Sequence, residues 1–240
     1  MMNYSGFRIV KSKLFWLAGL LLLAGLNGCA GSKVDVDLDG KNHFDKGRQA
    51  LEKKRYLRAQ EELNQAVISG AHTEWGDDAM FYLAEAYFQN EEYLLAIAEY
   101  ERLIRRMPFT EFLEQARYRI CEAYILESPK YYHDQEYTQK AIDEVQSFLD
   151  DFTISDYRDD ALAAHKKLRN KLAQKSYETG ILYIKMEEPE PALIAFDNVV
   201  NKYYDTEYYH LAHLETLHAY CIDFDLDKAR EYLNAEADLF

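Results

Sequence analysis

The chain has 240 residues, of which 28 are basic and 42 are acidic, so its net charge is near −14. An acidic surface repels nucleic-acid phosphates, and the sequence contains no basic stripe, which excludes a nucleic-acid-binding protein. Glycine and proline number only 10 and 4, a scarcity that is typical of an all-helical architecture. We therefore expect an all-α protein made of one domain or one repeat array.

The N-terminus has the parts of an export signal. Arg8, Lys11 and Lys13 form a basic start, and residues 14–26 then carry no charge. This apolar run is shorter than the ~20 residues that span a membrane, and it has the length of a signal-peptide core. It ends in Leu-Asn-Gly-Cys, which resembles the bacterial lipoprotein cleavage box. We predict a lipoprotein signal peptide over residues 1–28; the alternatives are a short amphipathic anchor and an ordinary signal peptide with an incidental cysteine.

Cleavage at this box would make Cys29 the lipidated N-terminus of the mature protein. The mature chain would then have 25 basic and 42 acidic residues, a net charge near −17. Such a chain is not attracted to anionic lipid, so its membrane anchor would have to be covalent. Residues 29–42 are polar and lack apolar periodicity, and we predict that they form a lipidated tether. Because Ala30 rather than Asp follows the cysteine, the resemblance implies sorting to the outer membrane.

A nine-residue interval that ends in alanine recurs along the rest of the chain. Its first member returns at positions 50, 87, 124, 183 and 220, so that three of the four steps are 37 residues. This period predicts an array of helical hairpins, a fold that binds extended partners and seldom carries out chemistry. The regular copies are Ala50/Ala59, Tyr87/Ala96, Tyr183/Ala192 and Tyr220/Ala229, whereas Tyr124 to Ala141 is 17 residues because of an eight-residue insertion.

Helical patterns alternate with short breaks from Phe44 onward. Thr110 and Thr206 are expected to cap helices at their N-termini, and Pro191 suits a first helical turn. The insertion falls in a loop at about residues 129–136, between the two helices of the third repeat. The predicted helices are 44–54, 57–68, 77–89, 93–106, 111–126, 137–151, 156–186 and 191–202, then one after Thr206 and one from 227 to the end.

Small and aromatic residues at fixed places in each repeat resemble the tetratricopeptide repeat. Gly47 and Gly180 occupy the small position of the first helix, and Ala59 and Ala192 occupy that of the second. Small residues at both places let the two helices approach closely. We predict that residues 43–240 form a right-handed superhelical array of about five tetratricopeptide-like hairpins.

Residues 41–235 resemble the BamD family of outer-membrane lipoproteins, which belongs to the β-barrel assembly machinery. The resemblance rests on Cys29, the enlarged third repeat and the stretch 148–206. It implies a periplasmic scaffold that docks to a BamA-like barrel-assembly protein, joins other assembly lipoproteins, and helps to receive and insert unfolded outer-membrane proteins. Thr153 and Tyr204 replace prolines of the family, and Ala195 stands where many members carry Arg, so no partner contact is transferred.

Residues on the first helices of the repeats predict a peptide-binding groove. Its aromatic members stand at repeat positions that commonly face the concave side, and Arg48 lies among them. Arg48 would bind the carboxylate at the C-terminus of an unfolded outer-membrane protein, and the aromatic side chains would supply pockets. The alternative is that these rings pack against adjacent helices. The predicted aromatic residues are Phe44, Phe81, Phe88 and Tyr118.

Apolar residues at the end of the chain predict a second docking surface. Tyr232, Leu233, Leu239 and Phe240 are followed by no polar cap, which the end of a repeat array normally needs. We predict that they form an edge on which another subunit docks. The alternative is that the last turn folds back and covers itself.

No nucleophile elbow, phosphate loop or paired-cysteine motif is present, so we predict no enzymatic activity, no cofactor and no metal. His210, His213 and His218 are expected at the surface or at helix caps. Cys121 and Cys221 belong to different repeats, and we expect two reduced, structural thiols. A functional alternative is a periplasmic tetratricopeptide lipoprotein that scaffolds cell-wall enzymes or coordinates envelope constriction.

Overall fold

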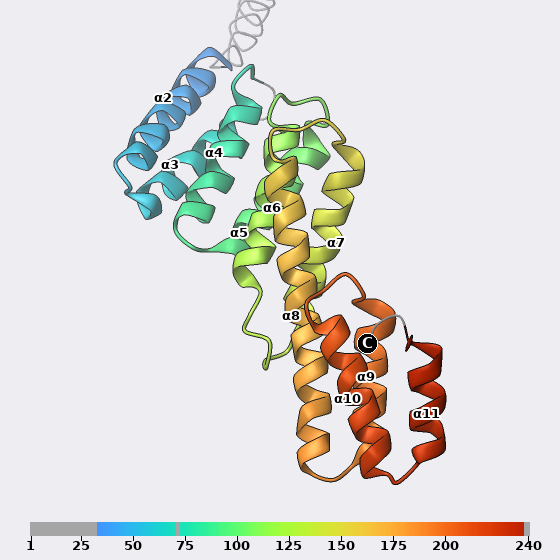
Figure 1. Cartoon of the computed structure of the whole chain (residues 1–240). Helices are drawn as coiled ribbons and strands as arrows, with labels where there is room; N and C mark the ends of the chain where they lie inside the picture. The colour runs from blue at the N-terminus through green and yellow to red at the C-terminus, as the bar shows by residue number, and fades with distance from the viewer. Residues whose placement is uncertain (1–32, 71–72, 238–240) are drawn as a thin grey trace, which may run out of the picture.

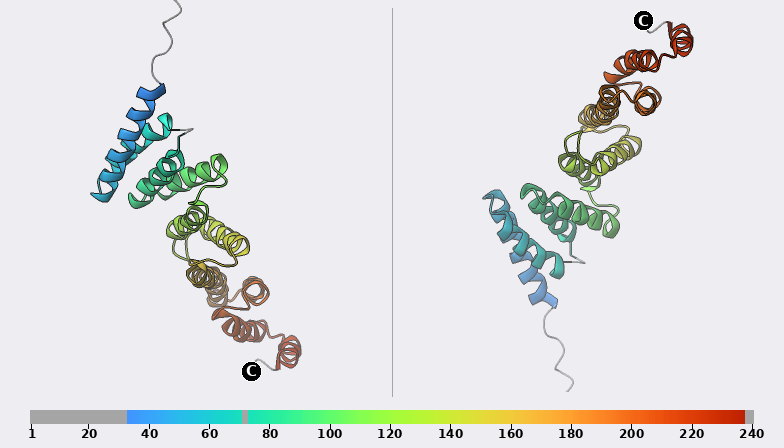
Figure 2. Two further views of the ribbon diagram at one scale, coloured as in Figure 1. Left: turned by 90° about the horizontal axis from the view of Figure 1, so that it is seen from above. Right: turned by 90° about the horizontal axis from the view of Figure 1, so that it is seen from below.

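The computed structural model describes residues 33–70 and 73–237, and these form ten helices. Successive helices pair into five antiparallel hairpins, which stack into an elongated array (Figure 1, Figure 2). The predicted all-α array of about five hairpins is therefore confirmed. The helices are α2 (Lys33–Glu52), α3 (Tyr56–Ser69), α4 (Gly76–Gln89), α5 (Tyr93–Arg106), α6 (Leu113–Glu127), α7 (Glu136–Asp151), α8 (Arg158–Lys185), α9 (Pro189–Lys202), α10 (Tyr208–Ile222) and α11 (Leu226–Ala235).

The nine-residue interval of the sequence spans the turn inside a hairpin, from the last turn of one helix to the first turn of the next. The Tyr87 carbonyl accepts a hydrogen bond from the Glu92 N–H at 3.0 Å, and the Glu92 carbonyl accepts one from the Ala96 N–H at 3.0 Å. Glu91 lies between them in the left-handed region, with φ 63°. This arrangement closes one helix and opens the next within a few residues. The same turn recurs in three other hairpins, with Lys54, Glu187 and Phe224 in the left-handed conformation.

Glycine allows two of the hairpins to close. A Cβ atom added to Gly47 would lie 2.5 Å from Cγ of Leu63, and one added to Gly180 would overlap the ring of Phe196. Leu63 and Phe196 are both fully buried. The prediction that small residues permit close helix approach is confirmed at these two crossings.

The long helix α8 joins the first three hairpins to the last two. It has 28 residues, twice the length of α9. Leu168 in its first half packs in the same cluster as Ala141 of α7, whereas Ala173 farther along packs in a cluster with Phe196 of α9. The predicted long helix is confirmed. Within the described residues, no helix is both long and apolar enough to cross a membrane.

Helix α2 begins earlier than the sequence pattern indicated. The pattern predicted a start at Phe44 after a polar tether, but the helix starts at Lys33, so residues 33–42 of the predicted tether are helical. Gly40 is buried in this part, where an added Cβ would lie 2.7 Å from Cβ of Ser69 and 2.9 Å from the Trp75 ring. Packing against Ser69 and Trp75 stabilises this part of the helix, although its sequence lacks the apolar periodicity of a helix.

Three predicted helix starts are also corrected. The Thr206 hydroxyl donates to the carbonyl of Tyr203 at 2.6 Å and does not cap α10. The Thr110 hydroxyl donates to Asp77 at 2.9 Å, and the N-cap position of α6 falls on the residue before Leu113. Helix α9 begins at Pro189, two residues before the predicted start, and Pro191 lies in its first turn as expected. The Thr206 hydroxyl thus stabilises the loop before α10, and the Thr110 hydroxyl joins its loop to α4.

Candidate docking surfaces

Phe44 and Phe81 do not form open pockets, because both are buried. Their side chains are 2% and 3% exposed. Phe44 stacks on Trp75 with ring centroids 5.8 Å apart, and Phe81 stacks on Phe112 at 4.3 Å. Trp75 and Phe112 each stand immediately before the first helix of the next hairpin. These rings therefore hold neighbouring hairpins together, and their predicted role as pockets is wrong.

The same contact continues through the third and fourth hairpins. Tyr118, also predicted for the groove, stacks on Tyr157 at 4.4 Å, and Tyr177 contacts Tyr208 at 5.4 Å. An aromatic ring on the first helix of one hairpin thus meets a ring at the entry to the next, four times along the array. Aromatic pairs of this kind stabilise by about 0.5–1.5 kcal/mol beyond the apolar area that they bury.

The sequence analysis assigned no role to the four aromatic residues at the entry to the following hairpins, although a short motif precedes each of them. Each is preceded by a hydroxyl residue and then an acidic one. The hydroxyl group bonds within the loop or to an adjacent helix, for example from Thr73 to the Gly70 carbonyl at 2.9 Å. The four copies are Thr73-Glu74-Trp75, Thr110-Glu111-Phe112, Ser155-Asp156-Tyr157 and Thr206-Glu207-Tyr208.

Phe88 belongs to the joint between the second and third hairpins. It is half-buried, and the Arg119 guanidinium lies 4.9 Å from its ring centroid. Arg119 Nε donates to Glu85 Oε1 at 2.8 Å, and the same oxygen accepts from the Tyr100 hydroxyl at 2.5 Å. Burial is the main cause that raises the pKa of Tyr100, so its phenol stays protonated. The site is a buried polar joint rather than an open pocket.

Arg48 is the predicted groove residue that remains exposed. Its guanidinium carbon lies 4.7 Å from the ring centroid of Tyr82 and 5.9 Å from that of Phe44. None of the ion pairs found in the described part of the chain involves Arg48. An arginine that rests on aromatic faces is held in place and still presents its donors to a carboxylate.

A cleft of about 910 Å³ opens where the loop 128–135 meets α8 and α9. The loop is the insertion of the third hairpin, and the sequence assigned no site to it. Gln135 Nε2 organises the loop by donating to the carbonyls of Lys130 at 2.8 Å and His133 at 3.0 Å. Lys175 Nζ of α8 donates to the His133 carbonyl at 2.8 Å and so fixes the loop against the helix.

The cleft combines amide and hydroxyl groups with an apolar rim. On its floor, Asn198 Nδ2 donates to the Ser176 hydroxyl at 2.8 Å, and that hydroxyl donates to the Ala195 carbonyl at 3.1 Å. Ile194 lies at the rim with 72% of its surface exposed. Such a lining suits a protein segment, whose backbone hydrogen-bonds to the polar groups while an apolar side chain covers Ile194. Further lining residues are Gln139, Leu172, Thr179, Tyr183, Pro191 and Tyr203.

Of the residues predicted to form a docking edge at the chain end, one contacts the fold and one is exposed. The Tyr232 hydroxyl lies 2.6 Å from His213 Nδ1 of α10, so this side chain is engaged within the fold. Leu233 is 43% exposed and open to a partner. Leu239 and Phe240 lie outside the described residues. The docking edge therefore stays a prediction, with Leu233 as its described apolar member.

Two side chains of α10 differ from expectation. His213 is buried, whereas surface or capping histidines were predicted; His210 and His218 are exposed. Burial lowers the pKa of His213, so its imidazole is neutral near pH 7. Cys121 is buried as predicted for a structural thiol, but Cys221 is exposed on the opposite side of the helix from the core. Helical position alone did not show which side of α10 later helices would cover.

Comparison with known proteins places these surfaces in a family context. Residues 36–232 match the model of a family described as outer membrane lipoprotein, YfiO. The outer membrane protein assembly factor BamD of Rickettsia prowazekii is 26% identical over 231 residues, covering 92% of this chain and 89% of that protein. BamD of Vibrio cholerae is 25% identical over 202 residues, covering 80% and 84%. Among solved structures, the TPR domain of P58(IPK) has a TM-score of 0.45 at 17% identity, covering 83% of this chain and 52% of that chain.

Proposed function

Because the chain belongs to the YfiO family of outer membrane lipoproteins, we propose that it is an outer membrane protein assembly factor. The observation that carries the proposal is the extent of the family match, which takes in the eight helices from α3 to α10 completely and most of α2 and α11. An array of hairpins joined by buried aromatic contacts offers extended surface rather than a reaction centre. The protein therefore acts as a non-enzymatic scaffold.

The cleft beside the loop 128–135 is the surface on which the barrel-assembly partner docks. Its polar floor is already organised by hydrogen bonds from Ser176 and Asn198, so little ordering is needed when a partner binds. Ile194 gives the rim an exposed apolar contact. The partner is a BamA-like barrel-assembly protein, and the lipid at Cys29 keeps the scaffold on the periplasmic face of the outer membrane beside other assembly lipoproteins.

Co-purification from cells tests both the function and the surface. Ile194→Arg places a charge at the cleft rim and is expected to reduce recovery of the barrel-assembly protein about tenfold or more, since burying an unpaired charge costs several kcal/mol. Ile68→Arg is the matched control. Ile68 is also an exposed isoleucine on the second helix of a hairpin, α3, with 67% of its surface exposed.

The pull-down outcomes separate the alternatives. Equal recovery with both variants would remove the cleft as the docking surface while leaving the assembly function in place. Recovery of peptidoglycan hydrolases in place of the barrel-assembly protein would support a scaffold for cell-wall enzymes and overturn the proposed function.

A further inference from the structure

Two loops of the array each expose one large apolar side chain almost completely. Phe109, between α5 and α6, is 99% exposed, and Ile154, between α7 and α8, is 94% exposed. They occupy equivalent places, each immediately before the hydroxyl residue of the loop motif, Thr110 or Ser155. The following hydroxyl and aromatic groups bond or stack within the fold, which leaves Phe109 and Ile154 at the tips.

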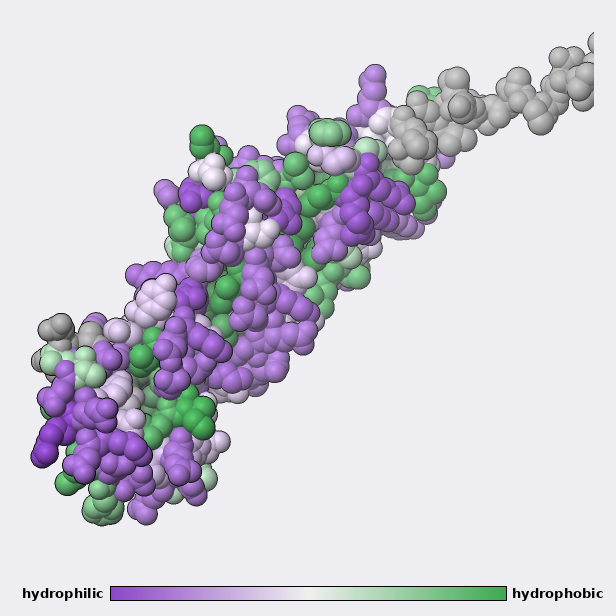
Figure 3. Space-filling model, turned by 90° about the vertical axis from the view of Figure 1, so that its right-hand side faces the viewer, coloured by the Kyte–Doolittle hydropathy of each residue, from purple (hydrophilic) through white to green (hydrophobic). Residues whose placement is uncertain are grey.

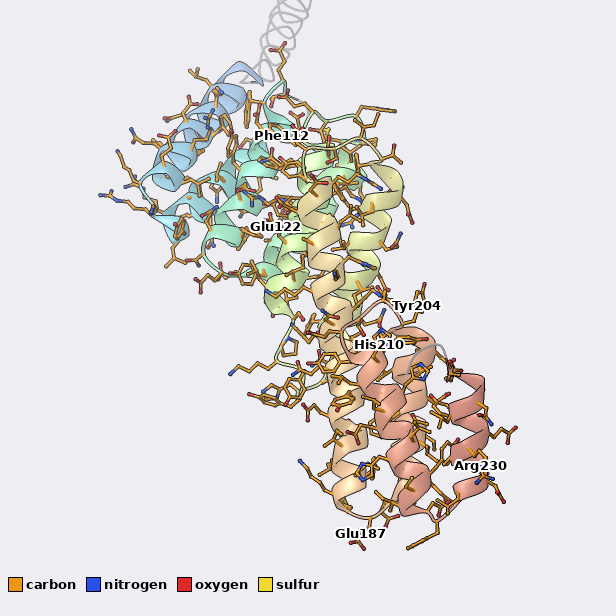
Figure 4. All side chains as sticks on the ribbon, in the orientation of Figure 1. Phe112, Glu122, Glu187, Tyr204, His210 and Arg230 are labelled. Carbon is orange, nitrogen blue, oxygen red and sulfur yellow. The ribbon has the colours of Figure 1, made fainter. Side chains whose placement is uncertain are left out.

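Both loops lie on the same edge of the molecule as the start of α2. Figure 1 shows the N-terminus of α2, the α5–α6 loop and the α7–α8 loop together at the upper end of the array, and Figure 4 labels Phe112 in this region. On the face shown in Figure 3, hydrophobic side chains project from the upper part among hydrophilic ones. The α10–α11 turn lies at the opposite, lower end.

The position of the lipid anchor relates this edge to the membrane. Only four residue steps separate Cys29 from Lys33, the first residue of α2. Even a fully extended chain spans at most about 14 Å over that distance. A lipid on Cys29 would therefore hold the start of α2, and the loop edge beside it, close to the membrane surface.

The charges around the loops favour an uncharged lipid surface. Acidic residues outnumber the nearby basic residues Arg105, Arg106 and Arg158, so anionic headgroups would be repelled. Zwitterionic headgroups do not oppose approach in this way, and they leave apolar insertion as the attractive contribution. The acidic residues on the loops and on the first turns of the adjacent helices are Asp77, Asp78, Glu111, Glu114, Asp156, Asp159 and Asp160.

We propose that Phe109 and Ile154 insert into the interface of the zwitterionic leaflet that holds the lipid of Cys29. The inference rests on the lipid anchor of the proposed function. Insertion of both tips would add an apolar contribution beside the lipid anchor. Two separate tips beside the anchor also restrict rotation, so the cleft near α8 and α9 keeps a defined orientation relative to the membrane.

Depth-dependent fluorescence quenching tests the insertion in the lipidated mature protein. Trp75→Phe leaves this form without tryptophan, and Phe109→Trp, Ile154→Trp or Phe224→Trp then adds one probe. The proteins are reconstituted into phosphatidylcholine vesicles with or without brominated acyl chains. Phe224 is the matched control, since it is 88% exposed at the opposite edge. Circular dichroism verifies that each variant is folded, and mass spectrometry verifies the lipid on Cys29.

We expect the probes at positions 109 and 154 to lose about half of their emission in brominated vesicles, and the probe at 224 to be unaffected. A lipidated, vesicle-bound protein without quenching at 109 and 154 would overturn the insertion and leave the anchor intact. Quenching of all three probes would also overturn it, because the edge would then have no preferred orientation. A chain without lipid on Cys29 would overturn the anchor and the insertion together. Burial of both tips by a co-purified protein would overturn the insertion and assign the edge to that protein.

Discussion

Arg48 shows how the local environment of one residue decides whether it can bind a ligand. The neighbouring Phe44 is buried, whereas Arg48 is exposed and its guanidinium lies 4.7 Å from the ring centroid of Tyr82. The sequence placed both residues in one groove because they share a helix face. Only packing separates them: Trp75 covers Phe44, and no described residue forms an ion pair with Arg48.

Replacing Arg48 tests its predicted role toward the C-terminal carboxylate of unfolded outer-membrane proteins. Arg48→Glu is expected to weaken binding of a peptide that ends in an aromatic residue and a carboxylate about tenfold, the loss of one charge-assisted contact. Fluorescence anisotropy with a labelled peptide measures the affinity. Lys46→Glu makes the same charge change on the exposed part of α2 and should leave the affinity unchanged. An equal loss in both variants would reduce the effect to overall charge and remove Arg48 as a binding residue.

At the scale of helices, α11 is the element with the least support. None of its own residues is buried, and its Tyr232 reaches back to His213 of α10. His213 is buried beside Tyr209 and has no hydrogen-bond partner at Nε2 among the described residues. Burial and, to a smaller extent, His210 lower the pKa of His213, while Glu236 opposes them. The docking of α11 therefore depends on an imidazole that resists protonation.

Acidification should loosen α11. Because the pKa of His213 in the folded protein is below its ordinary value of 6.5, the undocked state binds protons more readily. Docking is thus at full strength above about pH 6.5 and weakens as the pH falls toward the lowered pKa. Hydrogen-exchange protection of α11, corrected for intrinsic rates, should fall several-fold between about pH 7.5 and 5.5.

A neutral replacement at the same position separates this cause from general acid effects. His213→Gln should remove the dependence of α11 protection on pH, and His210→Gln, on the exposed side of the same helix, should retain it. An unchanged pH dependence in His213→Gln would assign the effect to other groups near the helix.

At the scale of the whole molecule, the proposed lipid anchor is a single residue outside the described part, Cys29. Cys29→Ser removes the thiol that would carry the lipid, so we expect the chain to leave the outer-membrane fraction and to lose its acyl mass. Membrane fractionation and mass spectrometry measure both outcomes. Cys221→Ser is the matched control, since Cys221 is an exposed cysteine of the array. Retention of the Cys29→Ser chain in the membrane fraction would contradict a lipid-only anchor.

The same scale shows why the cleft escaped prediction. The eight-residue insertion was evident from the longer interval between Tyr124 and Ala141, but the sequence did not show where the inserted loop packs. Its loop contacts Lys175, more than forty residues later, and the cleft then closes on α9. Contacts between such distant residues depend on the length and direction of α8, which no local pattern specifies.

The sequence by itself determined the hairpins, their number and the insertion of the third one. It could do so because the turn at Glu91 and the close approach at Gly47 involve residues within one repeat. The turn recurs in every regular copy, and the close approach recurs at Gly180. Only the tertiary structure decided which side chains remain exposed. Phe81 is covered by a ring from the next hairpin, while Phe109 is left exposed, although both are phenylalanines. Burial depends on what packs against a residue, and for rings such as Phe81 that neighbour comes from the next repeat of the stacked array.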